Sequence, residues 1–108
     1  MNRKSIICRP LLTLACFIIP AVSSFAKLNV VATTADFGSI AREIGANMVE
    51  VTVLAKPTED PHFVDPKPSY IVKLSRADLL VEGGAELEMG WLPPLIDGAR
   101  NSKIQLGK

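Results

Sequence analysis

Apolar and polar residues follow one another along the first half of the chain with the spacing of a strand, a helix and a second strand. Residues 28–32 form a short run rich in valine, and the apolar residues from Phe37 to Ile44 recur at helical spacing before Gly45, where a helix is expected to stop. In residues 49–53 valine alternates with polar residues, which predicts a second strand. Since a helix separates the two strands, we expect them to be parallel neighbours joined by a right-handed crossover.

A proline-rich loop interrupts this pattern in the middle of the chain. Four prolines lie in residues 55–68, and their restricted φ angles and missing N–H groups predict a stiff loop outside the sheet. A short helix is predicted to follow, with Ile71, Val72 and Leu74 facing the core. Residues 78–81 then predict a third strand.

The last part of the chain predicts another helix. Apolar residues at helical spacing extend from Leu87 to Ile96, and Pro93-Pro94 should bend or break this stripe, because residues without an N–H group suit the first turn of a new helix. Residues 103–106 are the candidate start of a fourth strand.

This order of elements predicts an α/β fold with an open, mostly parallel sheet and flanking helices. A parallel sheet needs cover on both faces, and a chain of this size buries little more than ~60% of its surface. We therefore expect residues 27–108 to be an incomplete α/β lobe, one part of a longer protein.

Residues 1–26 have the composition of a secretory signal peptide. Three basic residues stand near its start, an apolar stretch follows, and small residues precede Ala26, after which we expect cleavage. The apolar stretch is shorter than the ~20 residues of a membrane-spanning helix. An uncleaved anchor and a lipid-modified Cys16 are the alternatives. In each case the protein is expected to be periplasmic or otherwise extracytoplasmic.

Cysteine content and charge exclude several classes of function. Both cysteines, Cys8 and Cys16, lie in the leader, so residues 27–108 have no thiol for a disulfide or a thiolate metal site. The 108 residues include 12 lysines and arginines and 11 acidic residues, and three of the basic residues but no acidic one lie in the leader. The remainder therefore has a net charge of −2, which argues against a nucleic-acid partner.

The only histidine, His62, lies in the proline-rich loop, at a position where a ligand is expected. Ligands of open α/β sheets collect at the carboxyl ends of the parallel strands, and this loop follows the second strand. A neutral imidazole is a good zinc ligand, and Glu59, Asp60 and Asp65 add negative charge beside it. One histidine does not make a tetrahedral site, so a surface or hydrogen-bonded histidine is the alternative to a metal ligand.

A catalytic role has little support in the sequence. Thr33, Thr34 or Ser39 could act as a nucleophile with His62 as the base. However, the chain has no Gly-x-Ser-x-Gly turn and no acid whose position would orient the histidine. We therefore predict that the protein is not an enzyme.

Three features near the end of the chain are assigned to structure alone. Gly83-Gly84 lacks the lysine and the glycine spacing of a phosphate-binding loop, and it predicts a turn. Trp91 lies at helical spacing among leucines and is predicted to be a core residue. Glu86 and Glu88 are predicted to lie on a solvated face at the start of a helix.

Five segments of the chain carry a resemblance to a known family. The most specific is the run from Asp60 to Ser69, Asp-Pro-His-Phe-Val-Asp-Pro-Lys-Pro-Ser. The others are Ala32 to Thr34, Val49 to Thr52, Leu74 to Leu79 and Gly90 to Leu92. In their order along the chain, the five segments resemble the opening of the metal-specific solute-binding proteins of zinc and manganese ABC importers, over essentially all of residues 27–108.

The resemblance implies two α/β lobes joined by a long helix, with a metal ion held between them by histidines and a carboxylate. It assigns the first of these ligands to His62 and the remaining ligands to positions beyond Lys108. The implied function is the binding of a divalent metal ion, zinc or manganese, for delivery to an ABC permease, and nitrogen ligation favours zinc. The alternative is a secreted α/β fragment of a hydrolase-like or structural protein in which the histidine is incidental.

Overall fold

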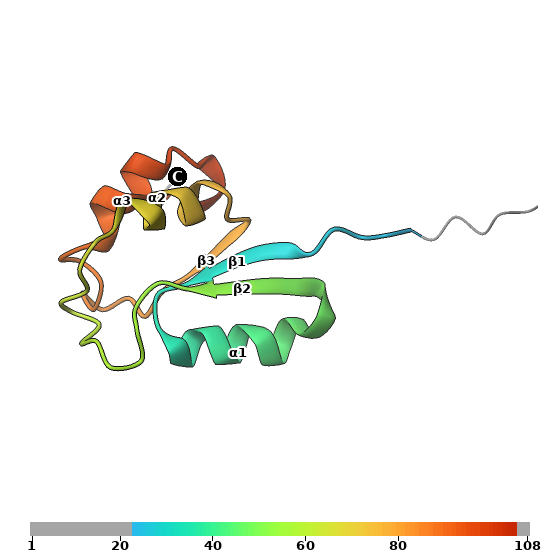
Figure 1. Cartoon of the computed structure of the whole chain (residues 1–108), viewed down its shortest axis with the longest axis horizontal. Helices are drawn as coiled ribbons and strands as arrows, with labels where there is room; N and C mark the ends of the chain where they lie inside the picture. The colour runs from blue at the N-terminus through green and yellow to red at the C-terminus, as the bar shows by residue number, and fades with distance from the viewer. Residues whose placement is uncertain (1–22, 106–108) are drawn as a thin grey trace, which may run out of the picture.

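The computed structural model describes residues 23–105, which form a three-stranded sheet with helices on both faces (Figure 1). In chain order the elements are β1 (Leu28–Ala32), α1 (Ala35–Gly45), the 3-10 helix η1 (Ala46–Met48), β2 (Val49–Val53), α2 (Pro68–Ser75), β3 (Leu79–Val81), α3 (Leu92–Ala99) and the 3-10 helix η2 (Ser102–Ile104). The predicted signal peptide, with Cys8 and Cys16, lies outside the described residues except for residues 23–26. Within residues 23–105 no helix has the length and apolar character needed to cross a membrane.

The sheet has the strand order β2-β1-β3, and both of its pairings are parallel. Val30 at the centre of β1 pairs with Val51 on one side and with Leu79 on the other. The predicted α/β class, the parallel sheet and the crossover through α1 are therefore confirmed. The three strands end at the same edge of the sheet, since parallel strands share one direction.

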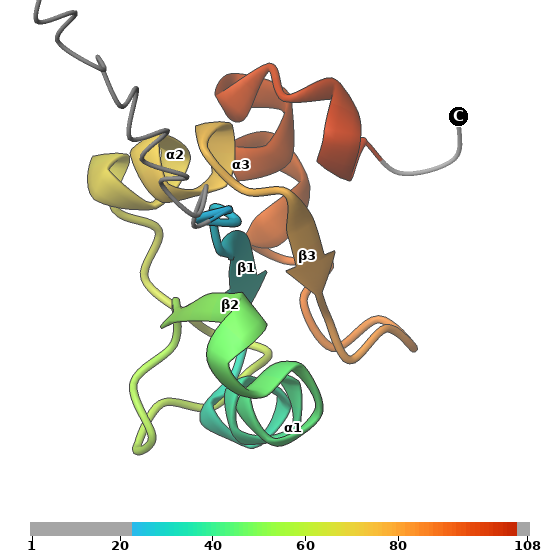
Figure 2. The ribbon, with the colours of Figure 1, turned by 90° about the vertical axis from the view of Figure 1, so that its right-hand side faces the viewer.

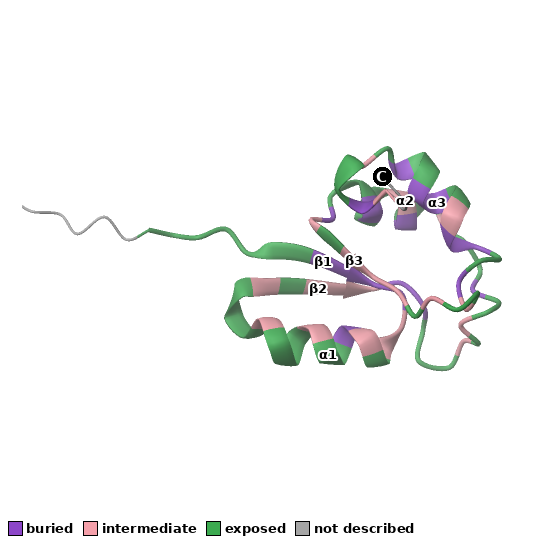
Figure 3. Ribbon diagram, turned by 180° about the vertical axis from the view of Figure 1, so that it is seen from behind, coloured by how far each residue is buried: buried purple, intermediate pink, exposed green. Residues whose placement is uncertain are grey.

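The helices divide between the two faces of the sheet. Figure 2 shows α1 on one face and α2 with α3 on the other. The main core lies on the side of α2 and α3, where Val31, Leu74, Leu92 and Ile96 are buried together. Burial in Figure 3 is likewise concentrated on α2, α3 and the adjoining part of β1. Most of the buried apolar side chains therefore lie on the face of the sheet covered by α2 and α3.

Two sequence predictions for the helical layer are wrong in detail. Val72 was expected to face the core, but it is 50% exposed, and Tyr70 is buried instead. Tyr70 and Leu74 are four residues apart and so lie on one side of α2, which turns Val72 outward. The expected fourth strand at 103–106 is also absent from the described part of this segment, where residues 102–104 form η2 with Asn101 as the N-cap. Residue 106 lies outside the described residues.

The apolar stripe of α1 is only partly covered. Ile40 is 54% exposed and Ile44 is 81% exposed. They line an apolar groove with Val30 and Leu79, on the side of the sheet where α1 lies over β1 and β2. β3 thus has less cover on this face than its neighbours.

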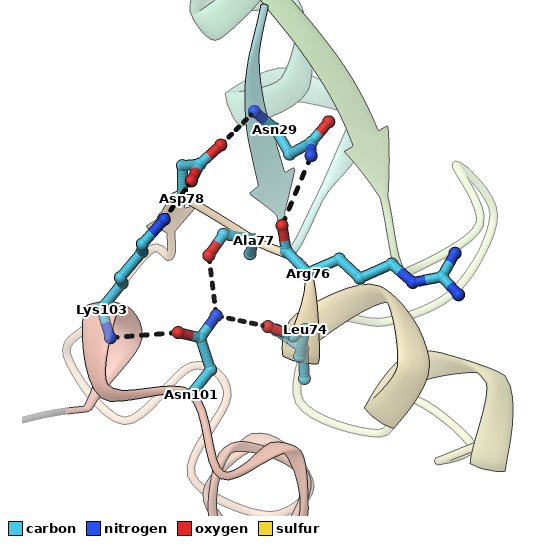
Figure 4. Close-up of polar contacts among 7 residues, drawn as sticks. All are labelled: Asn29, Leu74, Arg76, Ala77, Asp78, Asn101 and Lys103. Carbon is cyan, nitrogen blue, oxygen red and sulfur yellow. Dashed lines mark hydrogen bonds and ion pairs between the residues drawn. The ribbon is translucent and has the colours of Figure 1, made fainter. Parts of the chain in front are cut away.

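A polar network joins the end of α2 to η2 (Figure 4). The amide Nδ2 of Asn101 donates to the carbonyl oxygens of Leu74, at 2.9 Å, and Ala77, at 2.7 Å. These carbonyls belong to the last turn of α2 and the residues after it, where a helix leaves acceptors unpaired. The carboxylate of Asp78 accepts hydrogen bonds from the backbone N–H of Asn29, at 2.9 Å, and from the Lys103 ammonium. The network therefore fastens the carboxyl-terminal segment to the start of the sheet.

The Asp78 contacts predict a loss of stability in acid. The hydrogen bond from Lys103 and then that from Asn29 hold the pKa of Asp78 below its ordinary value. The stabilisation is therefore present above the unfolded pKa of about 3.9 and is lost as the pH falls through the lower folded pKa. We expect Asp78→Asn to reduce the difference between the urea midpoints at neutral pH and at about pH 3. An unchanged difference would show that Asp78 does not contribute to acid denaturation.

Candidate metal centre

The carboxyl ends of the three strands are tied together at Thr33, the residue after β1. Its backbone N–H donates to the carbonyl of Val81 at 3.0 Å, and its carbonyl accepts from the N–H of Ala55 at 2.9 Å. The loops that follow β1, β2 and β3 therefore start side by side at one edge of the sheet (Figure 1). This is the edge at which the sequence predicted a ligand site.

His62 lies at this edge, in the loop between β2 and α2, with its ring oriented by Asp60. One oxygen of the Asp60 carboxylate, Oδ1, lies 2.9 Å from the backbone nitrogen of His62 and 2.8 Å from its ring Nδ1. Hydrogen bonds from the His62 backbone and then from its ring hold the pKa of Asp60 below its ordinary value. An ionised carboxylate only accepts hydrogen bonds, so Nδ1 is the donor in this contact and carries a proton. When Nδ1 carries the single proton of a neutral ring, the lone pair of Nε2 is left for a ligand.

The orientation of His62 matches what a metal-binding histidine requires. Such histidines commonly donate the second ring N–H to a carboxylate or a carbonyl, which sets the tautomer and raises the basicity of the ligating nitrogen. The His62 side chain is 57% exposed, so it is not enclosed by the residues around it. Asp60, which was predicted only as a nearby negative charge, is thus the direct partner of His62.

The other two acidic residues of this loop do not complete a metal site. The Glu59 carboxylate accepts from the backbone N–H of Lys56 at 2.7 Å, which closes the turn that begins the loop. Asp65 is exposed. Over residues 23–105 no group of three or more histidine, cysteine, aspartate or glutamate side chains is arranged to hold a metal ion. Within the described chain His62 is therefore a single oriented donor.

The turn between β3 and α3 contains a buried carboxylate that the sequence interpretation missed. Glu88 was predicted to be solvated, but it is only 3% exposed. Its Oε1 accepts from the Thr33 hydroxyl at 2.6 Å and from the N–H of Gly83 at 2.7 Å, while Oε2 accepts from the N–H of Gly84 at 3.2 Å. The one signal in the sequence is the position of Glu88, four residues after a pair of glycines whose N–H groups a carboxylate can reach.

The contacts of Glu88 also explain the glycine pair. The turn begins at Gly84, which has a φ of 68° and whose carbonyl accepts from the N–H of Leu87, and the N–H groups of Gly83 and Gly84 bind the carboxylate of Glu88. Glu82 lies next to this turn, and burial, followed by the negative charge of Glu88, raises the pKa of Glu82. The turn is therefore a region where negative charge is already concentrated, which makes it unsuitable for a phosphate group.

Two of the three hydroxyl groups considered as nucleophiles, those of Thr33 and Ser39, are engaged elsewhere, whereas the hydroxyl of Thr34, the N-cap of α1, makes no side-chain capping bond. Thr33 is fully buried and donates to Glu88. Ser39 donates to the carbonyl of Ala35 one turn earlier in α1, at 2.9 Å. Neither hydroxyl is bonded to His62, whose ring is bonded to Asp60. The arrangement therefore lacks the bonded pair of nucleophile and base that covalent catalysis uses.

Comparison with known proteins gives a consistent set of relatives. Residues 30–108 match the family described as zinc-uptake complex component A, periplasmic. The chain is 33% identical over 84 residues to the manganese ABC transporter substrate-binding lipoprotein scaA of Streptococcus gordonii, covering 75% of this chain and 27% of that protein. It is 31% identical over 80 residues to the manganese ABC transporter substrate-binding lipoprotein PsaA of Streptococcus pneumoniae, covering 71% of this chain and 26% of that protein.

Solved structures agree with these relatives. A crystal structure of ZnuA superposes with a TM-score of 0.66 at 29% identity, over 73% of this chain and 31% of that chain. The periplasmic zinc binding protein TroA from Treponema pallidum superposes with a TM-score of 0.65 at 25% identity, over 73% of this chain and 28% of that chain. The chain spans less than a third of the length of each of these four relatives. All four are named as binding or uptake proteins, and none is named as an enzyme.

Proposed function

We propose, since the chain belongs to the family of the periplasmic zinc-uptake complex component A, that it is part of a protein that binds a divalent metal ion outside the cytoplasm and delivers it to an ABC permease. The metal ion is the cargo of this protein. It is coordinated and later released, and no covalent bond is made or broken. The observation that carries the proposal is the orientation of His62 by Asp60 at the carboxyl edge of the sheet.

His62 is proposed to supply one neutral nitrogen donor, through Nε2. The remaining ligands are proposed to come from residues beyond Lys108, because the described residues contain no group of three or more histidine, cysteine, aspartate or glutamate side chains that could hold a metal ion. Relatives are named for manganese and for zinc. A nitrogen donor favours zinc over manganese, since imidazole suits the softer of the two ions.

Residues 27–108 are proposed to be part of an amino-terminal α/β lobe, preceded by a signal peptide that is cleaved after Ala26. The partly covered groove beside α1 supports this division, because a parallel sheet is normally covered on both faces. The chain covers 27% of scaA and 31% of the ZnuA chain, which also supports its assignment to one part of a longer protein. Localisation outside the cytoplasm is supported by the relatives, which are named as lipoproteins or as periplasmic proteins.

The assignment of His62 predicts a loss of affinity when its ring is removed. In the protein extended through its downstream residues, His62→Ala should weaken zinc binding at least tenfold, which corresponds to about 1.4 kcal/mol. A titration against a competing chelator measures this change. Asp97→Ala, which removes an exposed carboxylate from α3, is the matched control and should bind zinc as the unmodified protein does. Equal affinities of His62→Ala and the unmodified protein would remove His62 from the site.

A further inference from the structure

Two exposed residues of the loop after β2, His62 and Phe63, lie between two fixed points. Phe63 is 82% exposed. On one side Val64 is 3% exposed and belongs to the hydrophobic core. On the other side the carbonyl oxygen of Pro61 accepts a hydrogen bond from the indole Nε1 of Trp91 at 2.8 Å. The backbone around His62 is therefore held at both ends of a very short segment.

Trp91 is well placed to act as one of these fixed points. Its ring is 3% exposed and lies in the core, so its only polar atom is directed from the core to the loop. A buried indole N–H needs an acceptor, and here the acceptor is the residue directly before His62. The sequence interpretation assigned Trp91 to the core, which is correct, but it did not anticipate this second contact.

The turn that contains Trp91 is itself fastened to the edge of the sheet. The N–H of Trp91 donates to the carbonyl of Glu88 at 3.2 Å, and the Glu88 carboxylate holds Thr33 and the glycine turn after β3. Gly90 brings the same turn close to the loop, because a Cβ built on it would lie 3.4 Å from the carbonyl oxygen of His62. A continuous series of short contacts thus runs from the sheet through Glu88 and Trp91 to the backbone of His62.

We propose that Trp91 is a positioning residue for the metal donor His62: its indole N–H holds the carbonyl of Pro61 and thereby fixes the backbone from which the imidazole is presented. The inference rests on the proposed function of His62. A donor that is already held in place loses less conformational freedom when it binds a ligand, so its affinity is higher than that of the same donor on a mobile loop. Asp60 sets the rotation and tautomer of the ring, whereas Trp91 sets the position of its backbone.

Removing the indole N–H while retaining an aromatic ring tests this role. In the full-length protein, Trp91→Phe should weaken zinc binding about three- to tenfold in a chelator competition titration. In the metal-free protein the same variant should accelerate hydrogen exchange of the His62 amide several-fold, since that amide donates to Asp60 within the released segment. Replacing Trp91 with 3-benzothienylalanine, which has sulfur in place of the N–H group and nearly the same shape, should give both effects if the phenylalanine variant does not fold.

A matched core variant separates positioning from general destabilisation. Leu95 is 6% exposed and lies in the same hydrophobic core, one turn further along α3. Leu95→Ala should lower the urea midpoint at least as much as Trp91→Phe does, but it should leave zinc affinity and exchange at the His62 amide within twofold of the unmodified protein. Equal effects of the two variants on affinity would overturn the positioning role, as would unmodified affinity and exchange in the benzothienyl variant.

Failure of this inference can be distinguished from failure of the proposed function. If His62→Ala weakens zinc binding but the two Trp91 variants do not, the positioning role is wrong and the metal ligand stands. If His62→Ala binds zinc normally, the assignment of the ligand is wrong, and with it the role of Trp91 in metal binding.

Discussion

Replacing Glu88 with alanine is expected to destabilise the protein by about 1–3 kcal/mol, because the buried hydroxyl of Thr33 is left without an acceptor. The variant removes the acceptor of the Thr33 hydroxyl and of two backbone N–H groups in the turn after β3. Urea denaturation, followed by the fluorescence of the single tryptophan, measures the change in the free energy of unfolding.

The size of the Glu88 effect depends on its burial. Glu43 is an exposed glutamate on α1, and Glu43→Ala should change the free energy of unfolding by no more than about 0.5 kcal/mol. Glu88→Gln keeps the shape of the side chain and one acceptor oxygen, so it should fall between the two alanine variants. If Glu88→Ala were as stable as Glu43→Ala, the carboxylate would not be the link between β1 and β3 that the hydrogen bonds indicate.

Leu74→Ala is expected to lower the free energy of unfolding by about 2–5 kcal/mol, the usual cost of creating a cavity at a fully buried leucine. Leu74 of α2 has no exposed surface and belongs to the hydrophobic core that also contains residues of β1 and α3. Val72→Ala, on the exposed side of the same helix, removes a half-exposed side chain and should cost much less. Similar urea midpoints for the two variants would contradict the orientation of α2 in the structure.

The periodicity of the sequence was sufficient to predict the three strands of the sheet and their parallel topology, although it also indicated a fourth strand where η2 lies. The valine-rich runs became β1 and β2 at the predicted residues, and the helix between them required a parallel crossover. The side of α2 that faces the core was harder to predict, because a helix of 8 residues has too few apolar positions to define one side. Tyr70 and Val72 are both compatible with a buried position in such a short pattern, and packing against α3 selected Tyr70.

In the candidate site, a contact between neighbours in the sequence was predictable, whereas contacts between distant residues were not. The link between Asp60 and His62 joins residues two apart in the chain, so the sequence already placed the carboxylate beside the histidine. The link between Trp91 and Pro61 joins residues 30 apart, and that between Glu88 and Thr33 joins residues 55 apart. No spacing in a single sequence indicates such pairs, which is why Glu88 was assigned to solvent.

By itself, then, the sequence determined the order and kind of most elements, the parallel sheet, the edge at which a ligand is expected and the residue, His62, proposed to bind it. Only the tertiary structure decided that Glu88 is buried, that α2 buries Tyr70 rather than Val72, and that the Trp91 indole holds the loop before His62. The reason is physical. Strand and helix patterns depend on neighbours along the chain, whereas burial of a carboxylate or an indole N–H depends on partners that only folding brings within hydrogen-bonding distance.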